Sequence, residues 1–133
     1  MTNIHDRAPL KLKRINKELY MLKKRFNFNV IINIDCLDII IKTYFKKHKC
    51  LIHIRLLNDY PFICPSVRLN GINYKHFLKK ASIKHNMTTM CLCCESILCP
   101  DNWKPGYKLA DIIDEIINYS RYYQCFLPVD VYD

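Results

Sequence analysis

The chain has 133 residues, half of them apolar, which is enough for one packed domain and excludes a chain that is mainly disordered. Its formal net charge is +9, and no apolar run is long enough to span a membrane. The N-terminal residues are polar and include no apolar signal region, so we expect a cytoplasmic, or also nuclear, protein with no membrane partner. We expect a single domain over residues 1–133.

The first predicted element is a basic amphipathic helix. Its apolar residues recur at three- and four-residue spacing, which is the period of one helix face: Leu12, Ile15, Leu19, Leu22 and Phe26. Residues 10–25 contain seven Lys or Arg and one Glu, which fits either a solvated face or a docking site for an acidic protein surface. Aromatic residues do not interleave with the basic ones in a nucleic-acid-binding pattern, so we expect no nucleic-acid partner.

Four strands are predicted next, because segments rich in β-branched and aromatic residues are separated by polar turns. They cover residues 28–34, 37–45, 50–57 and 67–69. The connection at Asp35-Cys36 allows only a tight turn, and Asn70-Gly71 forms a turn after the fourth strand. Short turns between consecutive strands favour an antiparallel meander.

A last helix is predicted over residues 107–123, where apolar residues share one face: Leu109, Ile112, Ile113, Ile116 and Ile117. Between the fourth strand and this helix we expect an irregular segment, which includes residues 84–106. The predicted fold class is therefore α+β, with an N-terminal helix, a four-stranded antiparallel sheet, an irregular segment and a long helix.

Eight cysteines are many for a chain of this size. Four are close together and four are scattered singly: Cys91, Cys93, Cys94 and Cys99, then Cys36, Cys50, Cys64 and Cys125. We expect reduced thiols inside a cell, and most of them as small buried apolar residues. Structural zinc usually has two close cysteine pairs, which this chain lacks, so we expect no metal and no other cofactor. Zinc at the cluster and a redox pair on Cys91 and Cys94 remain alternatives.

Five short motifs follow one another along the chain. They are Arg14-Ile15-Asn16-Lys17-Glu18-Leu19, Tyr60-Pro61-Phe62-Ile63-Cys64-Pro65-Ser66-Val67, Asn86, Cys94-Glu95-Ser96-Ile97-Leu98 and Trp103-Lys104-Pro105-Gly106. In this order and spacing they resemble the motifs of the ubiquitin-conjugating enzyme family, and the resemblance spans roughly residues 12–117. It implies a UBC-like fold. The His and Pro of the family's His-Pro-Asn are missing, and the chain ends where the family continues into further helices, so we expect a divergent, C-terminally short member.

The resemblance implies an acyl transferase that carries ubiquitin or a ubiquitin-like modifier as a cysteine thioester and passes it to lysine amines, usually with a ligase. Cysteine suits this reaction because its thiolate attacks readily and also leaves readily. The family spacing from the Asn and to the Trp implies that Cys94 is catalytic and that Asn86 stabilises the oxyanion or the active-site loop. Cys91 is the alternative, because Met90-Cys91-Leu92 resembles the family's Ile-Cys-Leu.

An acidic residue often positions the incoming lysine in this family. The chain has Ser96 at that place, so Glu95 or Asp101 would have to substitute. The resemblance also implies two docking surfaces on an expected monomer. The ligase would meet Phe62, Pro105 and Gly106, and the activating enzyme would meet Lys11, Lys13, Arg14 and Lys17. Two other functions remain open: a catalytically inactive UBC-fold variant that binds a modifier or a ligase, and an RWD-like protein-interaction domain.

Overall fold

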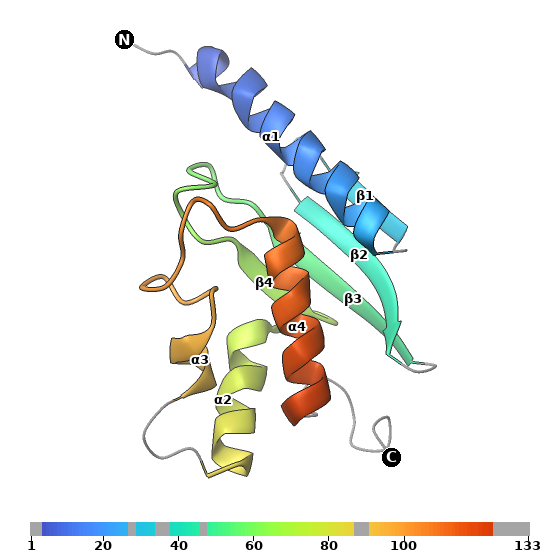
Figure 1. Cartoon of the computed structure of the whole chain (residues 1–133), viewed down its shortest axis with the longest axis vertical. Helices are drawn as coiled ribbons and strands as arrows, with labels where there is room; N and C mark the ends of the chain where they lie inside the picture. Colours follow the sequence, from blue (N-terminus) through green and yellow to red (C-terminus); the bar gives the residue numbers. More distant parts are fainter. Residues whose placement is uncertain (1–3, 27–28, 34–37, 46–47, 87–90, 124–133) are drawn as a thin grey trace.

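The computed structural model describes residues 4–26, 29–33, 38–45, 48–86 and 91–123, and Figure 1 shows their arrangement. The helices are α1 (Ile4–Arg25), α2 (Tyr74–Lys84), α3 (Leu92–Glu95) and α4 (Leu109–Tyr123). The strands are β1 (Asn29–Asn33), β2 (Asp38–Phe45), β3 (His48–Arg55), β4 (Ser66–Leu69) and β5 (Ile72–Asn73). The predicted α+β class is confirmed, with its N-terminal helix, antiparallel sheet and C-terminal helix.

The strands form one antiparallel meander in chain order, β1-β2-β3-β4-β5. The four predicted strands are present, and β5 adds a fifth strand of two residues. The predicted turn between β4 and β5 is confirmed, with positive φ at both Asn70 (51°) and Gly71 (83°), a conformation that Asn-Gly favours. The predicted turn at Asp35-Cys36 lies outside the described residues.

The register of β2 against β3 places buried isoleucines on one face of the sheet. Ile39 pairs with Ile54, and Ile41 pairs with Ile52, and all four side chains are almost fully buried. Burying such a side chain contributes about 1.5–3 kcal/mol. The alternation of buried and more exposed residues along β3 follows the strand period of two, as the sequence predicts.

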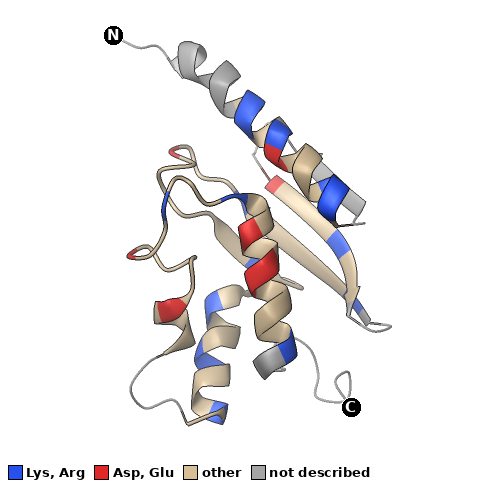
Figure 2. Cartoon of the chain, viewed as in Figure 1, with Lys and Arg blue, Asp and Glu red and all other residues tan. Residues whose placement is uncertain are grey.

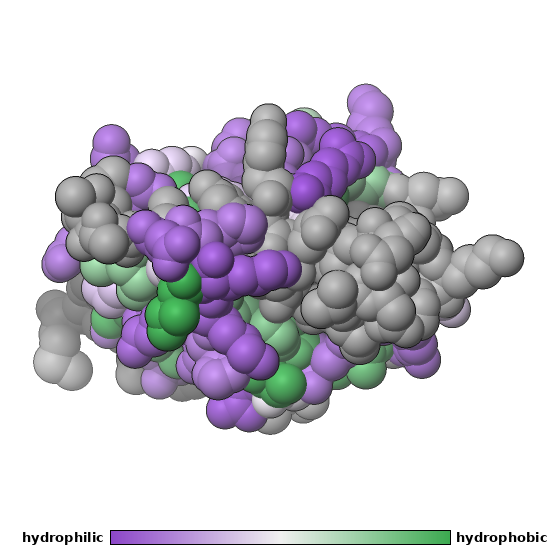
Figure 3. Space-filling view, turned by 90° about the horizontal axis from the view of Figure 1, so that it is seen from below, coloured by the Kyte–Doolittle hydropathy of each residue, from purple (hydrophilic) through white to green (hydrophobic). Residues whose placement is uncertain are grey.

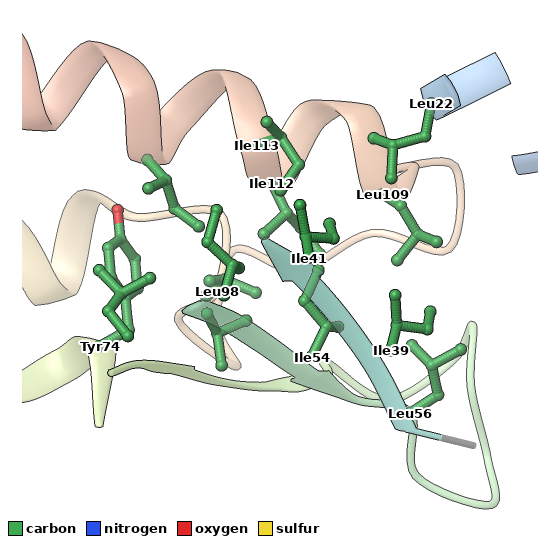
Figure 4. Packing of buried hydrophobic residues seen from close by; sticks show 14 of the residues in the cluster. Leu22, Ile39, Ile41, Ile54, Leu56, Tyr74, Leu98, Leu109, Ile112 and Ile113 are labelled. Carbon is green, nitrogen blue, oxygen red and sulfur yellow. The ribbon is translucent and has the colours of Figure 1, made fainter. Parts of the chain in front are cut away.

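Helix α4 covers this face of the sheet. Figure 4 shows Leu109, Ile112 and Ile113 of α4 pointing toward the isoleucines of β2 and β3, with Leu22 of α1 beside them. Helix α1 contacts α4, and Arg25 of α1 forms an ion pair with Asp114 at 2.9 Å. The core therefore lies between one sheet face and the two helices whose apolar stripes the sequence predicts.

Helix α2 is the main departure from the predicted fold, because the sequence analysis placed only irregular structure between the fourth strand and the last helix. It begins after Asn73, whose side chain accepts a hydrogen bond from the backbone N of Lys75 (2.9 Å). Its buried residues are Tyr74, Leu78, Ala81 and Ser82. Leu78 is the only strongly apolar residue among these four, so the apolar period of this helix is weak in the sequence.

Among the described residues seen from the lower end of the molecule in Figure 3, most are hydrophilic, and hydrophobic ones appear as small separate patches. None of the described helices has the length and apolar character that crossing a membrane requires.

Candidate active site

Cys94 lies in α3, a single helical turn that follows α2. Its backbone N donates a hydrogen bond to the carbonyl of Cys91 (2.9 Å), and its side chain is exposed. The Cys94 thiol is thus on the surface, where a large partner can reach it. The sequence analysis expected a loop at this position, and that expectation is wrong, because residues 92–95 close a helical turn.

Ser82 attaches this turn to α2. Its buried hydroxyl donates to the carbonyl of Leu78 (2.8 Å) and accepts from the backbone N of Leu92 (2.9 Å). The Leu92 side chain is fully buried. Leu92, the first residue of α3, is thus held both by this hydrogen bond and by its packing in the core. Helix α2, which the sequence analysis did not predict, therefore fixes where α3 begins.

Glu115 of α4 holds the segment that follows Cys94. Its carboxylate accepts hydrogen bonds from the hydroxyl of Ser96 (2.6 Å), the backbone N of Ile97 (2.9 Å) and the hydroxyl of Tyr74 (2.9 Å). Ser96, at the position of the family's acidic residue, is fully buried and faces this carboxylate rather than the surface. Three separate elements are therefore joined at one side chain next to the candidate nucleophile.

Asn102 closes the same segment from its other end. Its side-chain amide donates to the carbonyls of Cys94 (2.6 Å) and Ser96 (3.1 Å). The sequence analysis singled out neither Asn102 nor Glu115. A signal existed for Glu115, because it is an acidic residue beside the apolar stripe of the last predicted helix. Asn102 carries no such signal.

An open hollow of about 630 Å³ borders the Cys94 side chain. Its lining includes both acidic residues that the sequence offered, Glu95 and Asp101, and both are exposed. Lys104 and Tyr107 line it as well. Figure 2 shows acidic residues on α3 and in the loop after it, whereas the charged residues of α2 are all basic.

Asn86 ends the turn after α2. Its φ is +53°, a left-handed conformation that Asn tolerates better than most residues, and its backbone N donates to the carbonyl of Ile83 (3.1 Å). Its side chain is exposed. Residues 87–90, which connect it to α3, lie outside the described residues, and no hydrogen bond joins Asn86 to Cys94 among the described contacts. Its role beside the nucleophile stays a prediction.

Cys91, the alternative nucleophile, is half-buried directly before α3. Its Sγ lies 2.6 Å from the Sγ of Cys93 and 3.5 Å from the hydroxyl of Ser82. The hydrogen bonds from the Cys93 thiol and from Ser82 lower the pKa of Cys91, and the same interaction with Cys91 raises the pKa of Cys93 to about 12. The pKa of Cys91 favours its thiolate form, whereas exposure favours Cys94 as the residue that a large partner can reach.

The Phe62 turn and the Trp103 loop lie side by side. The indole N of Trp103 donates to the carbonyl of Pro61 (2.7 Å), and the peptide bond before Pro61 is cis. Phe62 is 76% exposed, and Pro105 and Gly106 are exposed as well. The structure therefore brings together the two segments for which the family resemblance implies ligase binding.

Helix α1 supports this surface through Arg14. Its guanidinium donates to the carbonyls of Pro105 (2.5 Å) and Tyr107 (3.1 Å) and to the carboxylate of Glu18 (3.2 Å). Among the residues assigned to the activating enzyme, Arg14 is thus engaged within the fold, whereas Lys13 and Lys17 are exposed. The side chain of Lys11 lies outside the described residues.

Cys64 replaces a proline of the family motif. Its thiol donates to the carbonyl of Leu98 (2.9 Å), and burial raises its pKa to about 11. It lines a groove of about 400 Å³, together with Phe62 and Trp103 among others. Cys64 therefore links the Phe62 turn to the chain that follows Cys94.

Comparison with protein-family models, with curated proteins and with solved structures gives no match for this chain. Within the part of the chain that the structure describes, no three His, Cys, Asp or Glu side chains lie where they could share a metal ion.

Proposed function

We propose that this protein is a divergent ubiquitin-conjugating enzyme of UBC-like fold, which carries ubiquitin or a ubiquitin-like modifier as a thioester on Cys94. The observation that carries this proposal is an exposed Cys94 thiol beside an open hollow, on a turn that Glu115 and Asn102 hold from two sides. The order of the motifs from Asn86 to Trp103 supports the same assignment.

The proposed reaction has two acyl transfers. The Cys94 thiolate attacks the thioester carbonyl of a modifier that is bound to its activating enzyme, and the activating enzyme's cysteine leaves as a thiolate. A lysine amine then attacks the new thioester, an isopeptide bond forms, and Cys94 leaves as a thiolate. The amine loses a proton to a base or to water. Glu95 and Asp101 border the hollow and are the carboxylates offered for this step, and Asn86 is the proposed oxyanion donor.

Two surfaces are proposed for partner proteins in the cytoplasm or the nucleus. The ligase would meet Phe62, Pro105 and Gly106, since the Trp103 contact holds these segments together and leaves Phe62 exposed. The activating enzyme would meet the basic face of α1, where Lys13 and Lys17 are exposed.

A charging assay tests the proposal. Purified protein is incubated with activating enzyme, ATP and, in parallel, ubiquitin and several ubiquitin-like modifiers, each with its own activating enzyme. We expect one modifier to give a band shifted by a single modifier on a non-reducing gel, and a thiol reductant should remove the shift. If no modifier shifts the wild-type protein, the proposed activity is wrong.

A binding-only UBC-fold variant is the second candidate. The exposed surface formed by Phe62, Pro105 and Gly106 does not include Cys94, so it could bind a ligase without any acyl transfer. Under this alternative the wild-type protein stays uncharged but binds a modifier or a ligase domain in a pull-down. Loss of that binding in Phe62→Ala, with the fold intact by circular dichroism, would support it.

A further inference from the structure

Two thiols next to the candidate nucleophile lie unusually close together. The Sγ atoms of Cys91 and Cys93 are 2.6 Å apart, and both side chains are half-buried, so small reagents can reach them. An S–S bond is about 2.05 Å long, so the two sulfur atoms need to approach by only about 0.5 Å to be joined. The contact between their sulfur atoms makes these two cysteines the candidates for such a bond.

We propose that Cys91 and Cys93 are a redox modification site, where a hydroperoxide converts the two thiols into a reversible intramolecular disulfide. The proposal goes beyond the acyl-transfer function and does not require Cys94 to carry a modifier. It differs from the pair Cys91 and Cys94 that the sequence spacing suggested, because Cys93 is the residue whose sulfur contacts Cys91.

The chemistry assigns different roles to the two thiols. Cys91 is the attacking thiol, since hydrogen bonds from Cys93 and Ser82 favour its thiolate. Its sulfur attacks one oxygen of the hydroperoxide, which yields a sulfenic acid and releases an alcohol, or water if the oxidant is hydrogen peroxide. The Cys93 sulfur then attacks the Cys91 sulfur. The hydroxyl group leaves with the Cys93 proton as water, and the disulfide forms.

The high pKa of Cys93 does not prevent the second step. The largest cause of that raised pKa is the hydrogen bond with Cys91, which belongs to the reduced pair, in which Cys91 is the thiolate. Two other described cysteines, Cys50 and Cys64, are less suited. Cys50 and Cys64 are thiols whose pKa burial raises to about 11, so they carry little thiolate at neutral pH.

The site is coupled by geometry to the candidate nucleophile. The backbone N of Cys94 donates to the carbonyl of Cys91 (2.9 Å), so a bond that shifts Cys91 also shifts the turn that carries Cys94. If the proposed acyl transfer holds, the oxidised protein should be charged at a different rate from the reduced one. The disulfide itself can be measured without any modifier.

The test uses the purified, reduced full chain with a small excess of hydrogen peroxide, followed by labelling of the remaining thiols with N-ethylmaleimide. Trypsin should cleave after Lys84 and Lys108, because the bond after Lys104 precedes a proline, and this gives one peptide with the whole cysteine cluster. We expect the peptide from oxidised protein to carry two labels fewer than the peptide from reduced protein. At the two unlabelled cysteines its mass should be lower than that of two free thiols by two hydrogen atoms. A reductant before labelling should restore both labels.

Four variants assign the bond. After peroxide treatment, Cys91→Ser and Cys93→Ser should no longer lose two labels. Cys94→Ser and the matched control Cys99→Ser should still lose two labels. Circular dichroism checks that each variant is folded. The proposal is overturned if the wild-type peptide keeps all its labels, if the loss survives in Cys91→Ser or Cys93→Ser, if it disappears in folded Cys94→Ser, or if the disulfide joins two copies of the chain.

Discussion

The hydroxyl of Tyr60 donates to the carboxylate of Glu18, with 2.9 and 2.8 Å to its two oxygens. Glu18 is 6% exposed, and it also accepts from the backbone N of Leu109 (2.9 Å) at the start of α4. One buried carboxylate thus joins α1, the turn before Phe62 and the helix that carries Glu115. The two residues belong to separate sequence motifs and lie 42 positions apart. Their hydrogen bond explains in structural terms why each motif contains its residue.

Replacing Glu18 should destabilise the fold strongly. Glu18→Ala leaves the Tyr60 hydroxyl and the Leu109 amide without their acceptor, and each such buried donor costs about 1–3 kcal/mol. We expect the free energy of unfolding in urea to fall by about 3 kcal/mol in total. The exposed neighbour Lys17→Ala is the control and should change it by less than about 0.5 kcal/mol. Equal effects of the two substitutions would contradict the role given to Glu18.

The buried thiol of Cys50 should make stability fall in alkaline solution. Burial raises the pKa of Cys50 from 9.0 to about 11, so the unfolded chain loses its proton at lower pH than the folded protein does. The contribution of the protonated Cys50 thiol to the free energy of unfolding is complete below about pH 9, and it is lost as the pH rises from about 9 toward 11. Between pH 8 and pH 10, wild type should lose about 1.4 kcal/mol more than Cys50→Val, which has no ionisable thiol.

Urea unfolding at the two pH values measures this difference. Cys64 and Tyr60 also have raised pKa values, and both remain in the variant, so their contributions cancel in the comparison. Identical losses for wild type and Cys50→Val would show that Cys50 titrates alike in the folded and unfolded chains.

Glu115 should act as a positioning residue for Cys94. Glu115→Gln keeps the size of the side chain but gives an NH₂ group where one carboxylate oxygen now accepts hydrogen bonds. We expect slower thioester formation, by on the order of 10- to 100-fold, since small displacements of a reacting group are costly. Asp114→Asn, which weakens only a surface ion pair, should charge like wild type. Normal charging by a folded Glu115→Gln would remove this role.

Asn86 offers a test that separates its backbone from its side chain. If its amide stabilises the oxyanion, Asn86→Ala should charge almost normally but should discharge to free lysine on the order of 100-fold more slowly. Alanine is also strained at the φ of +53°, and glycine is not. Both variants lack the side-chain amide, so under the oxyanion role Asn86→Gly should discharge to lysine as slowly as Asn86→Ala. Recovery of the wild-type discharge rate in Asn86→Gly would mean that only the backbone conformation matters.

Elements with a clear local period could be predicted from the sequence. The stripe of α1, the four strands and the face of α4 each repeat within one segment. The strands and α4 lie within two residues of their predicted limits, whereas α1 begins at Ile4, eight residues before the first residue of its predicted stripe. Helix α2 was missed, because only Leu78 among its buried residues is strongly apolar and its start depends on the Asn73 cap. The start of α4 at Leu109 rather than residue 107 reflects a local cap, where Asp111 accepts from the Lys108 amide.

The candidate site was predictable in part. Motif spacing favoured Cys94, and its exposure agrees with a nucleophile that meets large partners. The groups that hold it were largely not predictable. Ser82 and Asn102 act through contacts between segments that no local pattern connects, and the acidic position of Glu115 beside the helix stripe does not show which groups it binds. For the same reason the burial of Ser96 and the sulfur contact of Cys91 with Cys93 came only from the fold.

The identity of the charged cysteine tests the central claim most directly. In the charging assay Cys94→Ser should give, at most, a modifier band that resists thiol reductant, because a serine oxyester forms in place of the thioester. Cys91→Ser and the matched control Cys99→Ser should still give a band that the reductant removes. A reductant-sensitive band in Cys94→Ser, together with its loss in Cys91→Ser, would contradict the assignment and move the thioester to Cys91.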